Sequence, residues 1–281
     1  MKRFTTALIL FGVICFLAAC GSSDSIKVGV ANEEPYGYID LQTDNVTGAN
    51  AEIARAVFEK MGYEDVEGEV TDWNSLIPGL NAGNYNVVTA GMDIRPERCE
   101  QAEFADVELV YGEGMAVAAG NPHNIYSYED LVANEDLTVS IMSAANQIEI
   151  LQQLGMDSSR IQTADSIADN IAALESGDVD ATVMTEATLT AALESANLEA
   201  IERAEPFEQP VIDGEPQVAY GAAVFADSDE GRELRDQYNE HLQELIDSGE
   251  LLEIISEFGF GEENVPTGEV TTADRCNQEE A

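Results

Sequence analysis

Strand and helix signals alternate along almost the whole of this 281-residue chain. In the first third, compact β-branched runs predict buried strands and apolar residues three or four apart predict helices, in the order strand 26–30, helix 51–61, strand 66–70, helix 75–80 and strand 86–91. Gly83 and Asn84 end the second of these helices. Strands joined through helices pair in parallel, so the order predicts an α/β fold with a mostly parallel sheet.

The same alternation continues to the end of the chain. It predicts a short helix opening at Ser127–Asp130, strand 137–142, helices 146–154 and 167–174, strand 179–184, helix 186–195, strand 198–203, strand 218–225, a long helix 231–247 and a final helix 251–258. A chain of this length can form two lobes of moderate size, each with its own core.

Charge excludes one class of partner. The formal net charge is −43, and loss of Lys2 and Arg3 with an N-terminal leader would make it −45, leaving Lys27 and Lys60 as the remaining lysines. Such a surface is typical of proteins that work in high salt, where screening makes crowded like charge tolerable. Nucleic-acid binding requires a basic face and is excluded.

The segment from Thr71 to Asp106 contains the best candidate for ligand capture. Arg98 follows the strand at 86–91 in a turn. Ligands of open α/β sheets lie beyond the carboxyl ends of the strands, where an arginine can clamp a carboxylate through two charge-assisted hydrogen bonds. The alternative is a surface arginine paired with Glu97 or Glu100.

Three motifs carry a resemblance that covers roughly 26–260. ANEEPY at 31–36, DWNSLIPGL at 72–80 and AGMDIRPERC at 90–99 resemble the amino-acid-type class (family 3) of solute-binding proteins that serve ABC importers. More narrowly, they resemble the ectoine/hydroxyectoine-binding members of that class. The resemblance implies a two-lobed, type II periplasmic-binding-protein-like fold in which each lobe is a mostly parallel sheet flanked by helices.

The family's chain passes twice between its lobes. The resemblance therefore places the first lobe at 22–112 plus 218–281 and the second at 113–217. Hinges are expected near Tyr111–Glu113 and Gln217–Gly221.

The N-terminus carries an export signal. Two basic residues, an apolar run from Ala7 and the sequence Leu17-Ala18-Ala19-Cys20 are typical of a bacterial lipoprotein leader over residues 1–19. The alternatives are an ordinary signal peptide or an uncleaved anchor, although the apolar run is short for a membrane span. The resemblance implies that Cys20 is lipidated and tethers an extracytoplasmic domain, which would contact the membrane through this lipid alone.

Apart from Cys15 in the leader and Cys20 at its boundary, the chain has two cysteines, Cys99 and Cys276. In an exported chain they favour a disulfide that joins the C-terminal tail to the region of Arg98, as in the resembled subgroup. His123 and His241 are scattered, so we expect no metal site and no cofactor.

The resemblance assigns a ligand site to named positions. Tyr36 and Trp73 stand where ectoine binders place two rings that hold a flat cation, and Glu33 matches their carboxylate. Each has a structural alternative: a turn residue for Tyr36, a core residue or helix staple for Trp73 and solvated surface for Glu33.

The second lobe would contribute the turn at 140–146. Ser143 and Asn146 open a helix whose free N–H groups can bind a carboxylate, and Asn146 has the alternative of a plain N-cap. Two positions depart from the family pattern. Thr185 replaces the aspartate that holds an α-ammonium in amino-acid binders, and Asp93 replaces a third aromatic ring of ectoine binders, where it would either pair with the cation directly or mark a different ligand.

These features predict a monomeric solute-binding lipoprotein of an ABC importer that captures ectoine, hydroxyectoine or a similar zwitterion. The first alternative is a polar amino-acid-binding protein. An enzyme, such as a dehydratase on the same fold, is a remote alternative, because the sequence shows no nucleophile–base pair.

Overall fold

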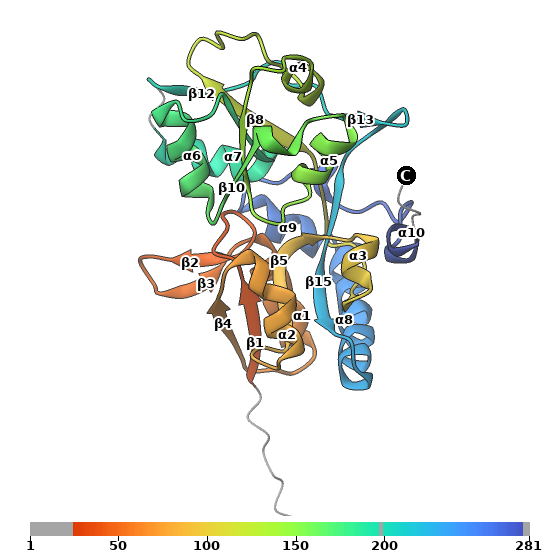
Figure 1. Cartoon of the computed structure of the whole chain (residues 1–281). Coiled ribbons are helices and arrows are strands. Elements are labelled where there is room, and N and C mark those ends of the chain that lie inside the picture. Colours follow the sequence, from red (N-terminus) through yellow and green to blue (C-terminus); the bar gives the residue numbers. More distant parts are fainter. Residues whose placement is uncertain (1–24, 197–198, 278–281) are drawn as a thin grey trace, which may run out of the picture.

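The computed structural model describes residues 25–196 and 199–277. They form two lobes stacked one above the other, each with a central sheet flanked by helices (Figure 1). The predicted leader and Cys20 lie outside the described residues. Within the described ranges, no helix combines the length and the apolar character that a membrane crossing requires.

The first lobe is built on a mixed sheet in the order β4-β1-β5-β15-β6, with β7 also pairing β15. Its strands are β1 (Ser25–Val30), β4 (Asp65–Val70), β5 (Val87–Asp93), β6 (Ala102–Phe104), β7 (Leu109–Tyr111) and β15 (Ala219–Ala226). β1 pairs in parallel with β4 and β5, as predicted, whereas β15 runs antiparallel to β5, β6 and β7.

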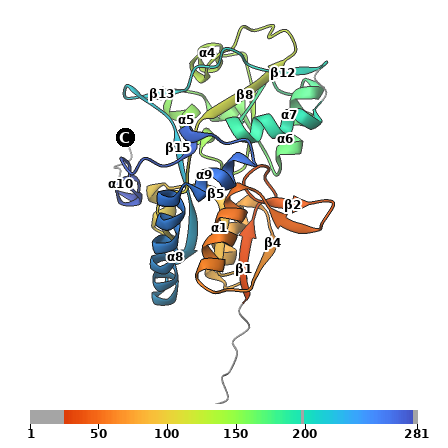
Figure 2. The same cartoon turned by 180° about the vertical axis from the view of Figure 1, so that it is seen from behind.

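Helices cover both faces of this sheet. α1 (Ala49–Lys60), α8 (Asp229–Ser248) and α9 (Glu250–Ser256) lie on one face, and the 3-10 turn η1 (Trp73–Ser75) with α2 (Leu76–Asn81) lies on the other (Figure 2). α1 buries Ile53, Val57 and Phe58, which recur at helical spacing. A small hairpin of β2 (Tyr38–Asp40) and β3 (Asn45–Thr47) projects from this lobe.

The second lobe holds a five-stranded sheet in the order β10-β9-β11-β8-β12. These strands are β8 (Glu113–Ala118), β9 (Val139–Met142), β10 (Ile161–Ala164), β11 (Ala181–Thr185) and β12 (Ile201–Arg203). Its flanking helices are α4 (Tyr128–Ala133), α5 (Gln147–Gln153), η2 (Ser158–Arg160), α6 (Ile167–Ser176) and α7 (Glu186–Ser195), and β13 (Val211–Ile212) with β14 (Glu215–Pro216) form a hairpin.

Side-chain alternation divides the core of the second lobe in two. Met115 and Val117 of β8 belong to one buried cluster, and Ala116 between them belongs to the other. Successive side chains of a strand point to opposite faces, so one sheet buries apolar residues against both helical layers.

The two crossings between the lobes lie side by side. Only Gly112 separates β7 from β8, and β15 brings the chain back so that Ala219 pairs with Tyr111. The side chain of Gln209 accepts from the Glu113 N–H at 2.8 Å and donates to its carbonyl at 3.0 Å, which holds the outgoing crossing. The lobe boundaries and hinges inferred from the sequence stay predictions.

Most expected elements are present, with ends that differ by at most three residues from those expected. The helix expected at 251–258 is present as α9 (Glu250–Ser256), but it is not the last one, because η3 (Glu262–Asn264) and α10 (Thr272–Cys276) follow it. The strands β6, β7, β8 and β10, the two hairpins and α3 (Pro96–Cys99) were not foreseen. Apart from β8, these elements carry too few residues for a periodic signal.

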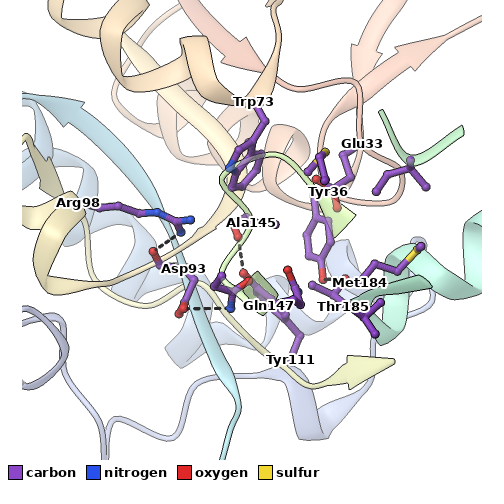
Figure 3. A pocket seen from close by; sticks show the side chains of 16 residues that line it. Glu33, Tyr36, Trp73, Asp93, Arg98, Tyr111, Ala145, Gln147, Met184 and Thr185 are labelled. Atoms are coloured by element: carbon purple, nitrogen blue, oxygen red, sulfur yellow. Dashed lines mark hydrogen bonds between the residues drawn. The ribbon is translucent and has the colours of Figure 1, made fainter. Parts of the chain in front are cut away.

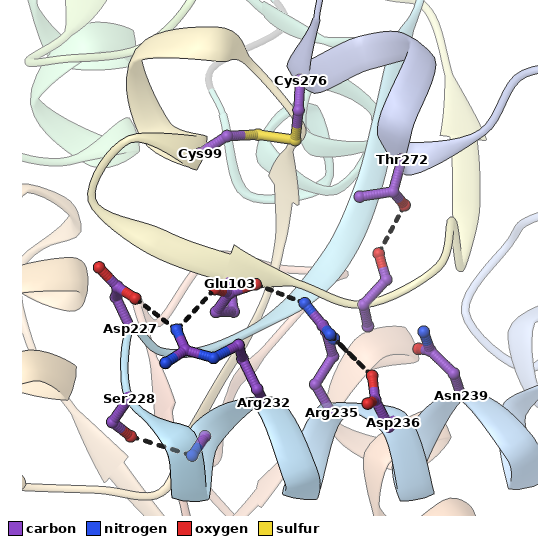
Figure 4. Close-up of polar contacts among 12 residues, drawn as sticks. Cys99, Glu103, Asp227, Ser228, Arg232, Arg235, Asp236, Asn239, Thr272 and Cys276 are labelled. Atoms are coloured by element: carbon purple, nitrogen blue, oxygen red, sulfur yellow. Dashed lines mark hydrogen bonds and ion pairs between the residues drawn. A yellow bond between two sulfur atoms is a disulfide. The ribbon is translucent and has the colours of Figure 1, made fainter.

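A disulfide between Cys99 and Cys276 links α3 to α10 across 177 residues of sequence (Figure 4). Thr272 supports the same contact by donating to the carbonyl of Ala105 at 2.7 Å. Closing a loop of this length restricts the unfolded chain and typically stabilises a fold by about 2–5 kcal/mol. The C-terminal segment is therefore held beside the turn that carries Arg98.

A buried carboxyl in the first lobe predicts a pH-dependent stability. Glu108 is fully buried, accepts hydrogen bonds from Tyr238 and from Asn50 at 2.6 Å, and burial raises its pKa to about 7 from 4.5. A raised carboxyl pKa contributes stability that is present below pH 4.5 and is lost as the pH rises through about 7. The free energy of unfolding of the wild type should therefore fall relative to Glu108→Gln over this range, by up to about 3 kcal/mol.

Denaturant unfolding of both proteins between pH 4.5 and 8 measures this difference. Glu240→Gln, an exposed change on α8, is the control and should run parallel to the wild type. A constant gap between the wild type and Glu108→Gln at every pH would contradict the assignment.

Candidate functional site

A cavity of about 30 Å³ lies between the two lobes, with eight lining residues from each side. The first lobe contributes Glu33, Tyr36, Trp73, Ala90, Gly91, Asp93, Arg98 and Tyr111, and the second contributes Met142, Ala145, Asn146, Gln147, Ile167, Val183, Met184 and Thr185 (Figure 3). A volume this small holds one or two water molecules, so the lobes approach each other closely here. Seven of the eight positions expected from the sequence line this cavity, and Ser143 does not.

Arg98 reaches the cavity from α3, which begins with Pro96 directly after the turn that follows β5. Its Nη1 donates to the carbonyl of Asp93 at 3.0 Å, and its Nη2 donates across the lobes to the carbonyl of Ala144 at 3.3 Å. Burial lowers the pKa of Arg98, but a guanidinium stays charged at any physiological pH. The alternative ion pair with Glu97 is made instead by Arg95, at 2.9 Å.

The two expected aromatic residues have different surroundings. Trp73 is half-buried, and the guanidinium of Arg98 lies 5.7 Å from its ring centroid. Tyr36 is only 2% exposed and packs against Tyr111 and Phe260, with ring centroids 5.2 and 5.6 Å away. Tyr36 is thus a core residue whose edge and hydroxyl reach the cavity.

Gly91 makes room for the Tyr36 ring. A Cβ at this position would lie 2.5 Å from Cδ1 of Tyr36, and the backbone φ of +60° is unfavourable for other residues. The glycine therefore lets β5 approach the ring closely.

Four side chains form a hydrogen-bond chain across the lobes. The Tyr36 hydroxyl donates to Oγ1 of Thr185 at 2.9 Å, Thr185 donates to Oγ1 of Thr188 at 2.9 Å, and Thr188 donates to Oε1 of Glu33 at 2.8 Å. All four residues are buried, and burial raises the pKa of Glu33 to about 7. Glu33 and Tyr36 come from the first lobe and the threonines from α7 and its N-cap, so the chain fastens the lobes together.

Asp93 does not direct a free carboxylate into the cavity. Its Oδ1 accepts from the N–H of Tyr220 at 2.9 Å and lies 3.7 Å from Nη2 of Arg275, while its Oδ2 accepts from Asn146 at 3.4 Å and lies 3.9 Å from Nη1 of Arg95. Both carboxylate oxygens already have protein partners, which argues against the expectation that Asp93 pairs directly with a ligand cation.

The turn before α5 also differs from expectation. Asn146 stands at the N-cap position but makes no capping bond, and its side chain reaches Asp93 instead. Ser143 accepts a hydrogen bond from Asn74 at 3.3 Å outside the cavity. Both residues join the lobes to each other.

Several residues of the site were not foreseen. Glu113, at the start of β8, is 2% exposed and accepts from Gln147 at 2.7 Å and from Tyr128 at 3.2 Å, and burial raises its pKa to about 7. Arg95 also pairs with Glu149 of the second lobe. In a chain with 55 acidic residues, no local pattern marks these carboxylates, because their roles depend on contacts distant in sequence.

Residues 26–262 match the family described as bacterial extracellular solute-binding proteins, family 3. The chain belongs to this family. Across residues 25–196 and 199–277, no group of three or more His, Cys, Asp and Glu side chains could hold a metal ion.

Three relatives illustrate the match. A probable amino-acid ABC transporter periplasmic-binding protein of Sinorhizobium fredii is 38% identical, over 90% of this chain and 83% of the relative. The arginine-binding extracellular protein ArtP of Bacillus subtilis is 28% identical, over 93% of this chain and all of the relative. The crystal structure of EhuB in complex with hydroxyectoine is similar with a TM-score of 0.80 and 25% identity, covering 91% of this chain and 95% of that one.

This family 3 protein is an exported solute-binding protein of an amino-acid-type ABC importer. Proteins of this kind bind a small ligand and deliver it to a permease. The relatives are binding proteins of transporters and not enzymes.

The hydrogen-bond chain predicts an effect of a single hydroxyl. Thr188→Val removes the donor to Glu33 and the acceptor for Thr185 while keeping the side-chain shape. Loss of a buried bond to a carboxyl costs about 1–2 kcal/mol, so ligand affinity should fall roughly 5- to 30-fold.

Calorimetry on the variant measures the loss. Thr190→Val is the matched control, since the exposed hydroxyl of Thr190 on the same helix bonds away from the cavity: it donates to the carbonyl of Glu186 at 2.9 Å and accepts from Arg203. Equal affinity of both variants and the wild type would show that the chain of hydroxyls does not contribute to binding.

Proposed function

We propose that this protein captures ectoine, hydroxyectoine or a similar zwitterionic compatible solute and delivers it to its ABC permease. The observation that carries the proposal is the lining of one interlobe cavity by a guanidinium, aromatic rings and a buried carboxyl, contributed by Arg98, Trp73, Tyr36 and Glu33. A dipolar solute needs these three kinds of partner. Hinge motion that brings both lobes onto the solute would form all contacts together.

Arg98 is suited to the anionic end of such a solute. A guanidinium has five N–H donors in a planar fork, and backbone carbonyls of Asp93 and Ala144 take two of them. Donors remain for a carboxylate, whose bidentate pairing with arginine is strong and directional. The half-buried position limits competition from water.

The side chains available for the cationic end of the solute suit a flat, delocalised cation better than a compact ammonium. An ammonium presents three donors and requires several acceptors when it is buried. Thr185 is neutral and lies in the interlobe hydrogen-bond chain, and both oxygens of Asp93 have protein partners. A delocalised amidinium instead gains about 0.5–2 kcal/mol from an aromatic face and needs one carboxylate, which Glu33 supplies.

A polar amino acid is the alternative ligand. The relatives that are named for amino acids, among them the arginine-binding protein ArtP, favour it. A dehydratase activity is the remote alternative. Glu33, whose pKa of about 7 suits acid–base chemistry, or Asp93, whose pKa burial also raises, could serve as the acid or base, and turnover of a bound ligand would reveal it.

The proposed setting is a membrane-anchored, monomeric receptor in a salt-rich medium. The leader and Cys20 support a lipid anchor, and the net charge of −43 supports a high-salt habitat. Mass spectrometry of the mature N-terminus tests the anchor.

Calorimetry in high salt with ectoine, hydroxyectoine, glycine betaine and the common amino acids tests the ligand. We expect ectoine or hydroxyectoine to bind most tightly and Arg98→Gln to reduce that affinity at least about 100-fold, in line with loss of a charge-assisted bidentate pair. Arg232→Gln, a change of the same kind on α8 outside the cavity, should leave it unchanged. Tight binding of one amino acid and none of the compatible solutes would overturn the proposal.

The pKa of Glu33 predicts how affinity depends on pH. A carboxyl with a pKa of about 7 is neutral below that value and attracts a cation only above it. Affinity for a cationic ring should therefore fall as the pH decreases from 8 to 5.5. In Glu33→Gln affinity should be low throughout and should not change with pH, whereas Glu34→Gln, an exposed neighbour, should behave like the wild type.

A further inference from the structure

The C-terminal helix α10 brings a third arginine to the ligand site. Arg275, next to Cys276 of the disulfide, places Nη2 3.7 Å from Oδ1 of Asp93. Its guanidinium also lies 5.1 Å from the ring centroid of Tyr220, a residue of β15. The tail therefore contacts both the end of β5 and the strand that returns from the second lobe.

Asp93 contacts the second lobe, the strand that returns from it and the arginine of the ligand site. Its carboxylate meets Asn146 of the second lobe and the N–H of Tyr220 in the returning strand, and its carbonyl accepts from Arg98. The residue is 4% exposed, so its charge depends on nearby cations for compensation. Burial raises the pKa of Asp93, and Arg275 is the strongest of the arginines that oppose this rise.

Arg275 stays in this position because the tail is fastened at two points. The disulfide joins Cys276 to Cys99, the neighbour of Arg98, and Thr272 donates to the carbonyl of Ala105 (Figure 4). The path from Arg275 to the ligand clamp is thus short: Arg275 to the Asp93 carboxylate, and the Asp93 carbonyl to Arg98.

We propose that Arg275, held by the Cys99–Cys276 disulfide, is a positioning residue for ligand binding, which fixes Asp93 so that Arg98 and Asn146 are set for a solute between the lobes. It acts through Asp93 and does not line the cavity itself. The inference rests on the proposed function only in that the interlobe cavity is the ligand site. It holds for a compatible solute and for an amino acid alike.

Affinity of Arg275→Gln provides the first test. The probes are hydroxyectoine, ectoine, L-glutamine and L-arginine, measured by calorimetry on the mature chain with its disulfide intact. We expect the affinity of whichever probe binds the wild type to fall at least about 10-fold, and Arg275→Lys to stay within about 3-fold because the charge is kept. Arg232→Gln, which loses ion pairs to Glu103 and Asp227 away from the cavity, should bind normally.

A double variant distinguishes a positioning role of Arg275 from a general loss of structure. If Arg275 compensates the charge of Asp93, then Asp93→Asn combined with Arg275→Gln should bind more tightly than Arg275→Gln alone. Cys276→Ser should reproduce the loss of affinity, because it frees the tail. Unchanged affinity in Arg275→Gln, or no rescue by Asp93→Asn, would overturn the inference.

Hydrogen exchange gives a readout that needs no ligand. After β5, the amide of Ile94 donates to the carbonyl of Tyr220 in β15, and the amides of Arg98 and Cys99 donate to the carbonyl of Arg95. We expect faster exchange of these amides in Arg275→Gln than in the wild type and Arg232→Gln, and equal exchange would also overturn the inference. If the wild type binds none of the probes, the proposed function fails while this measurement still decides the role of Arg275.

Discussion

The return of the chain into the first sheet as β15 is the constraint on which the rest of the structure depends. This strand pairs antiparallel with β5, β6 and β7, so the first lobe is complete only after the chain has passed through the second. It also sets the two crossings between the lobes side by side, because Ala219 pairs with Tyr111. The same strand supplies the N–H of Tyr220 that holds Asp93 at the end of β5.

Polar groups between the lobes are satisfied largely by one another. The threonines of the second lobe bind Glu33 and Tyr36, and Asn146 binds Asp93. A buried polar group without a partner is costly, so these pairs favour one relative placement of the lobes. A solute that replaces part of this network would have to offer comparable donors and acceptors.

The elements with strong periodic patterns were predictable from the sequence. α1 and α8 bury the faces that their apolar spacing indicates, and the β-branched run of β5 is buried along its whole length. The site was partly predictable, because the motifs around Tyr36, Trp73 and Arg98 resemble a known family. The partners of Asp93 were not, since Arg275 and Asn146 lie 182 and 53 residues away in sequence, and only the fold brings them together.

By itself, the sequence determined the alternation of strands and helices, the acidic surface and the family, since each follows from local pattern, composition or motif. The tertiary structure decided which carboxylates are solvated and which are buried with partners. It separated Glu34, which is exposed, from Glu33, which is bound by a threonine of the opposite lobe. The reason is physical: burial and charge compensation depend on surfaces that meet only when both lobes are folded and the chain has returned between them.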